Sequence, residues 1–286
     1  MSNLLIHPKT QSQLELTIKG GAHAILITGQ PGAGKSTVAK DIASKLLQTK
    51  LDNAPYFLRV TPDGKSVSIE QIRDLQKFVQ LKTTGTNEIR RVAVIDQADT
   101  MTTEAQNALL KLLEEPPEDT VLLLTASKPH QLKPTIHSRL QTVQLLAPTK
   151  TATLDYFMKQ GKTGTEIERA FMLSNGQVGL MTALLENIDE HALANSITTA
   201  KELYGMSPFE RLTQVDALSK DKDGLSNLLF ACKRICITAL EQAAAKAQQK
   251  QVQSWHRQLS LVLGAEESLK HNPNTKLLLT DLFIQM

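Results

Sequence analysis

The feature that most constrains the fold of this chain is a glycine-rich segment between an apolar run and an amphipathic run. It fits the pattern G-x-x-x-x-G-K-[ST], in which glycines let consecutive backbone N–H groups turn inward around phosphates. The apolar run predicts a strand and the amphipathic run a helix, which is the context that a P-loop requires. The predicted nucleotide-binding residues are Gly29, Gln30, Pro31, Gly32, Ala33, Gly34, Lys35, Ser36 and Thr37.

Three side chains have predicted roles around the phosphates. Lys35 would neutralise the β- and γ-phosphates, and the Ser36 hydroxyl would ligate Mg²⁺. A second Mg²⁺ ligand is expected at the tip of a neighbouring strand, and Asp96 ends the apolar run Val92–Asp96. Asp96 could instead only end that strand or cap the segment that follows. The predicted cofactors are therefore ATP and Mg²⁺.

The residue after Asp96 limits the expected chemistry. Many ATPases of this build place Glu there to orient and deprotonate the attacking water, whereas this chain has Gln97. An amide cannot accept a proton at neutral pH, and loss of a general base lowers a rate by about 10²–10⁴-fold. Asp99 could substitute, but the sequence does not give the direction of its side chain. The sequence therefore predicts ATP binding with slow hydrolysis.

The first half of the chain alternates short apolar runs with amphipathic runs, as in a parallel sheet covered by helices. The predicted strands are Ala24–Thr28, Tyr56–Val60, Val92–Asp96, Val121–Thr125 and Thr142–Leu146. The predicted helices between them are Ser36–Gln48, Ile69–Gln80 and Thr103–Glu115, the last with a capping box at Thr103-x-x-Gln106. After Pro148 only helical patterns follow, including Phe209–Ser219, Leu225–Gln248, Gln251–His271 and, after a turn at Asn272-Pro-Asn274, Thr275–Ile284.

The amino-acid composition indicates an ordinary soluble protein but does not identify its function. Of 286 residues, 41% are hydrophobic and 21% charged, as in ordinary soluble proteins, and the formal charge of +3 permits nucleic-acid contact without indicating it. The chain does not open on a secretory signal, and no apolar run reaches the roughly 18 residues of a membrane span. We therefore expect a cytoplasmic protein without membrane contact. Cys232 and Cys236 share one face of a predicted helix and are expected in its core, since two ligands cannot close a zinc site.

Several segments resemble bacterial clamp-loader subunits of the AAA+ family. They are Ile69–Leu75, Asp96–Met101, Asn107–Pro117, Leu132–Arg139 and Asn272–Leu279. The resemblance implies an α/β P-loop domain with a five-stranded parallel sheet over residues 1–148, a helical lid over 149–206 and an all-α oligomerisation collar over 207–286. It also implies a hetero-pentamer with motor and delta-type subunits, which opens the sliding clamp and closes it around primer–template DNA.

The same resemblance assigns further site residues. In this family a Ser-Arg-Cys sequence carries an arginine finger that reaches the ATP of the adjacent subunit. This chain has Ser138-Arg139-Leu140, which keeps the arginine and differs only in its apolar neighbour, so Arg139 is the catalytic candidate in trans. Without the resemblance, Arg139 would equally be a surface or ion-paired arginine. After the fourth strand, Thr125 and Ser127 are the sensor candidates, since either hydroxyl could face the γ-phosphate.

Departures from the family pattern indicate the type of subunit. Besides having Gln97, the chain reads Gly176-Gln-Val-Gly179 where motor subunits carry a lid arginine in Gly-Ser-x-Arg. Residues 45–60 hold no cysteine, so the family's zinc module is not expected. The first two features, at positions 97 and 179, favour the delta-prime (stator) type holding ATP. The third indicates a zinc-free variant and is a departure from the family pattern. The alternatives are an ATP-hydrolysing motor subunit, or another AAA+ ATPase such as a branch-migration helicase, which would be expected to carry an acid at position 97 and a basic winged-helix end.

Overall fold

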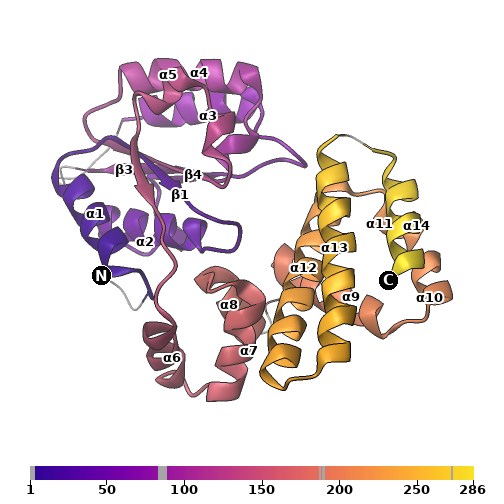
Figure 1. Ribbon diagram of the computed structural model, residues 1–286. Helices are drawn as coiled ribbons and strands as arrows, with labels where there is room; N and C mark the ends of the chain where they lie inside the picture. Colours follow the sequence, from indigo (N-terminus) through magenta and orange to yellow (C-terminus); the bar gives the residue numbers. More distant parts are fainter. Residues whose placement is uncertain (1–3, 83–88, 187, 189–190, 272) are drawn as a thin grey trace. The chain divides into compact units, whose positions relative to one another are not determined.

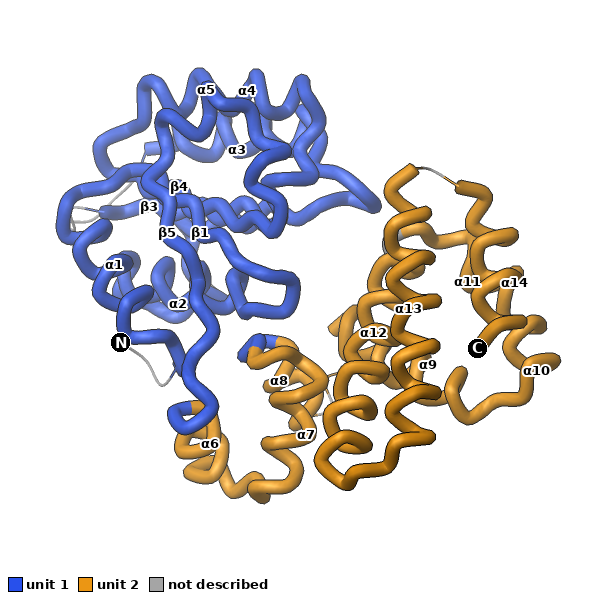
Figure 2. Tube along the Cα trace, in the orientation of Figure 1, with its two compact units in different colours: residues 1–152, 177–179 blue, residues 153–176, 180–286 orange. Residues whose placement is uncertain are grey.

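The computed structural model describes residues 4–82, 89–186, 188, 191–271 and 273–286 (Figure 1). The chain forms two compact units, coloured separately in Figure 2. Unit 1 contains residues 1–152 and 177–179, and unit 2 contains residues 153–176 and 180–286. Within the described ranges, none of the helices combines the length and the apolar character needed to cross a membrane.

Unit 1 is built around a parallel five-stranded sheet with the order β2-β3-β4-β1-β5. The strands are β1 (Ala24–Thr28), β2 (Phe57–Val60), β3 (Arg91–Ile95), β4 (Thr120–Ala126) and β5 (Gln141–Gln144). The predicted α/β fold with a five-stranded parallel sheet is confirmed, and each predicted strand lies within two residues of its observed bounds. Strand β4 lies between β1 and β3, so it separates the strand that leads into the glycine-rich loop from the strand that leads to Asp96.

Helices cover both faces of this sheet (Figure 1). One face packs against α1 (Pro8–Lys19) and α2 (Lys35–Leu47), and the other against α3 (Ile69–Gln80), α4 (Thr103–Glu114) and the short α5 (Pro134–His137). Three 3₁₀ turns complete the unit: η1 (Leu51–Asn53), η2 (Ala98–Thr100) and η3 (Pro129–Gln131). Side chains of β3 alternate between the two cores, since Val92 and Val94 join the α2 side and Ala93 and Ile95 the α3 side. Burial of both faces explains the nearly unbroken apolar runs of the strands.

The start of α4 differs from the prediction. The capping box predicted at Thr103 and Gln106 is wrong, because the N-cap is Thr102, whose hydroxyl accepts the Ala105 N–H at 3.2 Å. Gln106 is buried, and its side chain donates to the carbonyl oxygens of Met101 and Gln131 and accepts the Lys133 N–H. The side chain that the capping box would have used therefore joins the start of α4 to the segment at Gln131 and Lys133.

Unit 2 is helical and has one hydrophobic core that extends from Leu173 and Leu180 to Phe283. The helices after β5 are α6 (Lys150–Met158), α7 (Gly164–Ser174), α8 (Val178–Glu186), α9 (Ala192–Gly205), α10 (Pro208–Thr213), α11 (Val215–Leu218), α12 (Lys222–Ala245), α13 (Gln249–Lys270) and α14 (Thr275–Gln285). The first residues of α6 and α8 belong to unit 1 and all the others to unit 2. The predicted helix Phe209–Ser219 is two short helices, α10 and α11. Asn272, the first residue of the predicted turn, lies outside the described residues.

The core of unit 2 spans the proposed lid and collar segments. Arg234 of α12 donates to the carbonyl oxygens of Met172 and Leu173 in the last turn of α7, where carbonyl groups lack N–H partners within the helix; the Met172 oxygen also accepts the N–H of the C-cap residue Asn175. Helix α12 also packs along α9 and α13. The boundary between residues 206 and 207 stays a prediction.

The two cysteines lie on the buried face of α12, as expected. Cys232 and Cys236 are buried, and the Tyr204 hydroxyl lies 2.9 Å from the Cys236 sulfur. Burial raises the pKa of the Cys232 thiol to about 12. Within the described ranges, no group of three or more His, Cys, Asp or Glu residues is placed to hold a metal ion.

We expect both thiols to be unreactive in the native protein. A pKa near 12 for Cys232 leaves very little thiolate at pH 8, so alkylation by iodoacetamide should be slower than in denaturant by more than about 10²-fold. Mass spectrometry of the alkylated protein, native against denatured, measures this directly. Rapid labelling of the native protein would show that α12 does not keep its thiols buried.

Candidate phosphate site and exposed arginine

The glycine-rich loop connects β1 to α2 and has the backbone geometry of a P-loop. Gly32 and Gly34 adopt φ values of 80° and 88°, which side chains disfavour, and α2 begins at Lys35. The Lys35 ammonium folds over the loop and donates to the carbonyl oxygens of Gly29 and Gln30, each at 2.9 Å. The residues predicted from the pattern thus form one loop that ends in a helix N-terminus.

The charge of Lys35 is finely balanced. Burial lowers the pKa of its ammonium to about 8, while the negative charges of Asp99 and Asp96 act in the opposite direction. A bound anion would add to those two charges and favour the protonated form. The loop therefore places the Lys35 ammonium where a bound anion would stabilise its protonated form.

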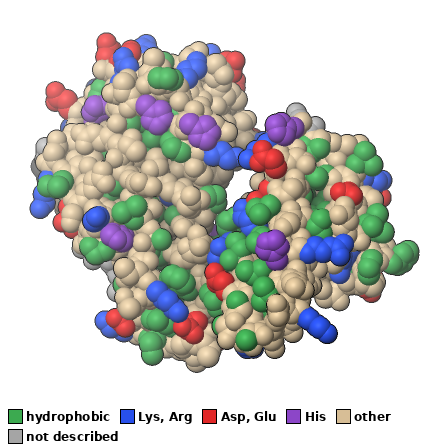
Figure 3. All heavy atoms as spheres, in the orientation of Figure 1, with side chains coloured by type: hydrophobic (Ala, Val, Ile, Leu, Met, Phe, Trp, Pro, Cys, Tyr) green, Lys and Arg blue, Asp and Glu red, His purple; other side chains and the backbone are tan. Residues whose placement is uncertain are grey.

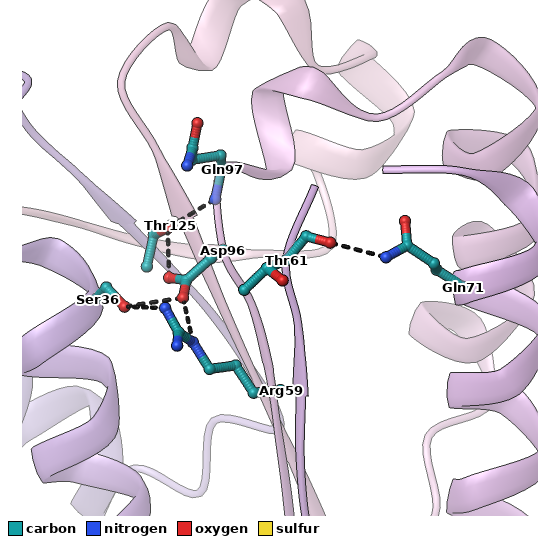
Figure 4. A network of polar contacts seen from close by, with 7 residues as sticks. All are labelled: Ser36, Arg59, Thr61, Gln71, Asp96, Gln97 and Thr125. Atoms are coloured by element: carbon teal, nitrogen blue, oxygen red, sulfur yellow. Dashed lines mark hydrogen bonds and ion pairs between the residues drawn. The ribbon is translucent and has the colours of Figure 1, made fainter. Parts of the chain in front are cut away.

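Asp96 follows β3 and is buried, with a relative exposure of 3%. Its Oδ1 accepts the Thr125 hydroxyl at 3.1 Å, and its Oδ2 accepts the Ser36 hydroxyl at 2.8 Å (Figure 4). The side chain of Arg59, on β2, completes the group, with Nε 2.7 Å from Asp96 Oδ2. The structure thus brings together the predicted metal ligands Ser36 and Asp96 and the sensor candidate Thr125, and adds an arginine.

The arrangement around Asp96 tests the predicted Mg²⁺ site. Hydroxyl and carboxylate oxygens are ligands that Mg²⁺ takes in such sites. In this chain, however, the Arg59 guanidinium donates to both: Nε to Asp96 Oδ2 and Nη2 to Ser36 Oγ at 3.3 Å. As arranged, the residues fit a guanidinium rather than the predicted ion.

The two candidate residues beyond Asp96 place their side chains differently. Gln97 is exposed, adopts the left-handed conformation with φ 52°, and its side chain points away from the Asp96 carboxylate (Figure 4). Asp99 Oδ2 accepts the N–H groups of Ser127 and Lys128, so this carboxylate fastens the end of β4, and its buried Oδ1 has no hydrogen-bond partner. Ser127, the second sensor candidate, meets Asp99 through its backbone.

Gly179 belongs to unit 1 and lies directly against the glycine-rich loop. A Cβ atom at this position would lie 2.8 Å from both the Gly32 carbonyl oxygen and the Gly34 nitrogen. Backbone therefore packs on backbone, and the position has no room for the arginine that motor subunits carry. The close approach gives a physical reason for glycine here.

Arg139 lies away from these residues, just after α5. Its Nη2 is 2.8 Å from the carboxylate of Glu114, and its Nη1 donates to the Thr135 carbonyl oxygen. The Arg139 side chain is 36% exposed and that of Glu114 is 51% exposed. Exposed ion pairs of this kind stabilise a protein by about 0–1 kcal/mol, so Glu114 positions the guanidinium but holds it only weakly.

Helix α4 fastens the segment that carries Arg139. In addition to the Glu114 pair, Asn107 accepts the Lys133 ammonium at 2.6 Å and Gln106 accepts the Lys133 N–H at 2.9 Å. Asn107 and Glu114 both come from the run that resembles clamp-loader subunits. That run therefore has a positioning role which its sequence alone did not reveal.

Sequence reasoning also missed Arg59. A charged residue in the predicted strand Tyr56–Val60 was the available signal, because strands buried on both faces seldom carry one. Its partner could not be found without the pairing of β2 with β3, which sets Arg59 opposite Val94, two residues before Asp96. Since side chains alternate, Arg59, Val94 and Asp96 share one face of the sheet.

The fold and the loop define a P-loop protein of the AAA+ type. The chain belongs to the family described as DNA polymerase III, delta subunit, which it matches over residues 6–149. It is 33% identical over 177 residues to DNA polymerase III subunit delta' from Pseudomonas aeruginosa, covering 54% of this chain and 53% of that protein. It is 32% identical over 155 residues to subunit delta' from Bacillus subtilis, covering 49% and 46%. The chain thus spans about half the length of the curated relatives it matches.

Solved structures share the fold over a longer stretch. A DNA polymerase III gamma subunit-related protein from Thermotoga maritima superposes with a TM-score of 0.58 over 96% of this chain and 97% of that chain, at 21% identity. A variant of RuvB from the same organism superposes with a TM-score of 0.50, at 18% identity, over 68% of this chain and 64% of that chain. At these identities the likeness concerns the fold alone.

The packing of Gly179 gives a stability prediction. Gly179→Ala forces the loop or the start of α8 to move, and overpacking of this kind costs about 1–3 kcal/mol. The melting temperature should therefore fall by several degrees. The matched control is Gly164→Ala at the start of α7, where a Cβ meets nothing within 4 Å. Equal melting temperatures for the two variants would contradict the close packing.

Proposed function

We propose that this protein is a delta-prime-like stator subunit of a replicative clamp loader. It binds ATP at its own P-loop and supplies Arg139 to the ATP site of a neighbouring subunit while the sliding clamp is loaded onto primer–template DNA. The observation that carries the proposal is the contrast between its two sites. The phosphate site has Gln97 turned away and Gly179 against the loop, whereas Arg139 is exposed and held in place by α4.

The proposed partners are motor and delta-type subunits in a hetero-pentamer. Membership of the DNA polymerase III delta subunit family supports this assembly, and similarity to subunit tau of Bacillus subtilis, 31% identical over 146 residues, agrees with it. The helices after residue 207 would form the collar. They expose the large apolar side chains of Phe209, Leu277 and Ile284. Figure 3 shows hydrophobic side chains scattered over the surface of unit 2, which contains these helices.

Arg139 suits a role in trans. Its guanidinium is permanently charged and presents several donors in one plane, which matches the oxygens of a phosphate group. Leaving Glu114 costs little because the pair is exposed. The hydrogen bond that the Lys133 ammonium donates to Asn107 keeps the segment in place meanwhile. The proposed catalytic contribution is stabilisation of charge on the γ-phosphate of the neighbour's ATP.

The protein's own ATP would be a structural ligand. Lys35 and the loop N–H groups can hold phosphates, and a ligand that binds only the folded state stabilises it in proportion to its occupancy. Gln97 cannot accept a proton, and the Asp99 carboxylate is bound to two backbone N–H groups. The proposal is therefore binding without efficient turnover, in contrast to a motor subunit.

Removal of Arg139 tests the trans role. In the complex reconstituted with its motor and delta-type partners, Arg139→Ala should lower turnover at the one site it serves by about 10³-fold or more. The DNA-stimulated ATPase rate would then fall to the contribution of the other sites. Arg73→Ala, an exposed arginine on α3, is the matched control and should leave the rate unchanged. An unchanged rate in the Arg139 variant would remove the finger assignment.

The isolated chain tests the stator role. It should bind ATP, and Lys35→Ala should weaken that binding by about tenfold or more, because the loop loses its cation. Hydrolysis by the unmodified chain should stay close to background in the same preparations, measured as phosphate release. Ready turnover that depends on Lys35 would identify a motor subunit instead.

A further inference from the structure

The guanidinium of Arg59 lies where the chain was expected to bind a metal ion. It donates from Nε to Asp96 Oδ2 at 2.7 Å and from Nη2 to Ser36 Oγ at 3.3 Å. Ser36 Oγ in turn donates to the same Asp96 oxygen at 2.8 Å, so the three side chains close a triangle of contacts (Figure 4). Both oxygens expected to ligate Mg²⁺ are thus partners of one arginine.

The backbone dictates this position. Arg59 on β2 pairs in register with Val94 on β3, and Asp96 follows two residues later on the same face of the sheet. The Asp96 N–H also donates to the Val60 carbonyl oxygen at 2.8 Å, which fixes the ends of the two strands relative to each other. The arginine therefore reaches Asp96 along a neighbouring strand and not from a loose terminus or loop.

Burial and charge favour a cation that belongs to the protein. The Asp96 side chain is 4% exposed, whereas that of Arg59 is 39% exposed, so the arginine covers a buried carboxylate from the solvent side. A buried carboxylate requires a compensating charge. Arg59 supplies it on Oδ2, and Thr125 binds Oδ1, so both oxygens of Asp96 have partners. A second, divalent cation at the same oxygens would be repelled by the first.

We propose that Arg59 replaces Mg²⁺ in this site and makes nucleotide binding independent of divalent cations. The inference rests on the proposed nucleotide site and deepens it. The remaining donors of the guanidinium can bind phosphate oxygens directly, as arginine does at many phosphate sites. Lys35 and Arg59 then neutralise the phosphates together, which suits a site that holds a nucleotide.

The alternative is that a metal–nucleotide complex displaces the arginine. The side chain of Arg59 is 39% exposed, so it has room to move into solvent, and the incoming metal ion would then supply the charge that the buried Asp96 requires. The two hypotheses predict different effects of Mg²⁺ on the affinity of the wild type for ATP. They also predict different effects of Mg²⁺ on a variant in which position 59 has no charge.

The experiment measures ATP binding to the full chain by calorimetry, in Mg²⁺ and in EDTA. The wild-type dissociation constants in the two buffers should agree within about twofold, whereas Arg59→Gln should bind at least about tenfold more tightly with Mg²⁺ than without. Arg59→Lys retains the cation and should stay independent of Mg²⁺. Arg73→Gln carries the same substitution outside the site and should behave as wild type. Circular dichroism melting establishes that each variant is folded.

Each outcome decides the proposal. Binding by the wild type that strengthens at least tenfold with Mg²⁺ overturns it, as does an Arg59→Gln variant that gains no dependence on Mg²⁺ or does not bind. If the wild type does not bind ATP but Arg59→Gln binds it with Mg²⁺, exclusion of the metal is supported and ATP holding is removed from the proposed function. The Arg139 assay in the complex is independent of all these results, so the two proposals fail separately.

Discussion

The buried carboxylate of Asp96 is the constraint on which the phosphate site depends. A polar group with 3% relative exposure requires hydrogen-bond partners, and the chain supplies them from three other elements. Ser36 comes from the start of α2, Arg59 from β2 and Thr125 from β4, so the carboxylate ties the glycine-rich loop to two strands that flank β3. The cation that compensates the buried carboxylate and a bound metal ion would use the same oxygens of Asp96 and Ser36. In this chain Arg59 already binds those oxygens.

The two proposed activities use different parts of unit 1. The phosphate site is formed at the carboxyl ends of β1, β3 and β4, whereas Arg139 follows α5 and is held by α4 through Glu114. No hydrogen bond described in the structure joins Arg139 to the residues around Asp96; its bonds go to Thr135, Ser138 and Glu114. Loss of a general base at position 97 therefore need not weaken the arginine. A subunit with this arrangement can lack ATP hydrolysis at its own site and still supply an arginine to the site of a neighbouring subunit.

Local patterns predicted what is local in this structure. The strands, the loop and the position of Asp96 at the end of β3 follow from apolar runs and from a motif whose chemistry fixes its backbone. The sheet order, and with it the contact between Arg59 and Asp96, depends on which strands pair over long distances in the sequence. The predicted capping box of α4 is wrong for a related reason, since the buried Gln106 side chain also has a partner 25 residues away. Sequence reasoning ended where a side chain takes a partner that is distant in the sequence.

Three residues distinguish this site from that of an active ATPase, and each of them acts through a different element of the structure. Gln97 lacks a basic group and also points away from Asp96, owing to a left-handed backbone. Gly179 leaves no room for a side chain beside the loop, and Arg59 binds the oxygens expected to ligate a metal. Restoring a glutamate at position 97 alone would change the chemistry of one side chain but neither its direction nor the other two obstacles. Under the proposed function, these three features together suit a site that holds phosphates rather than an ATPase that lacks one acid.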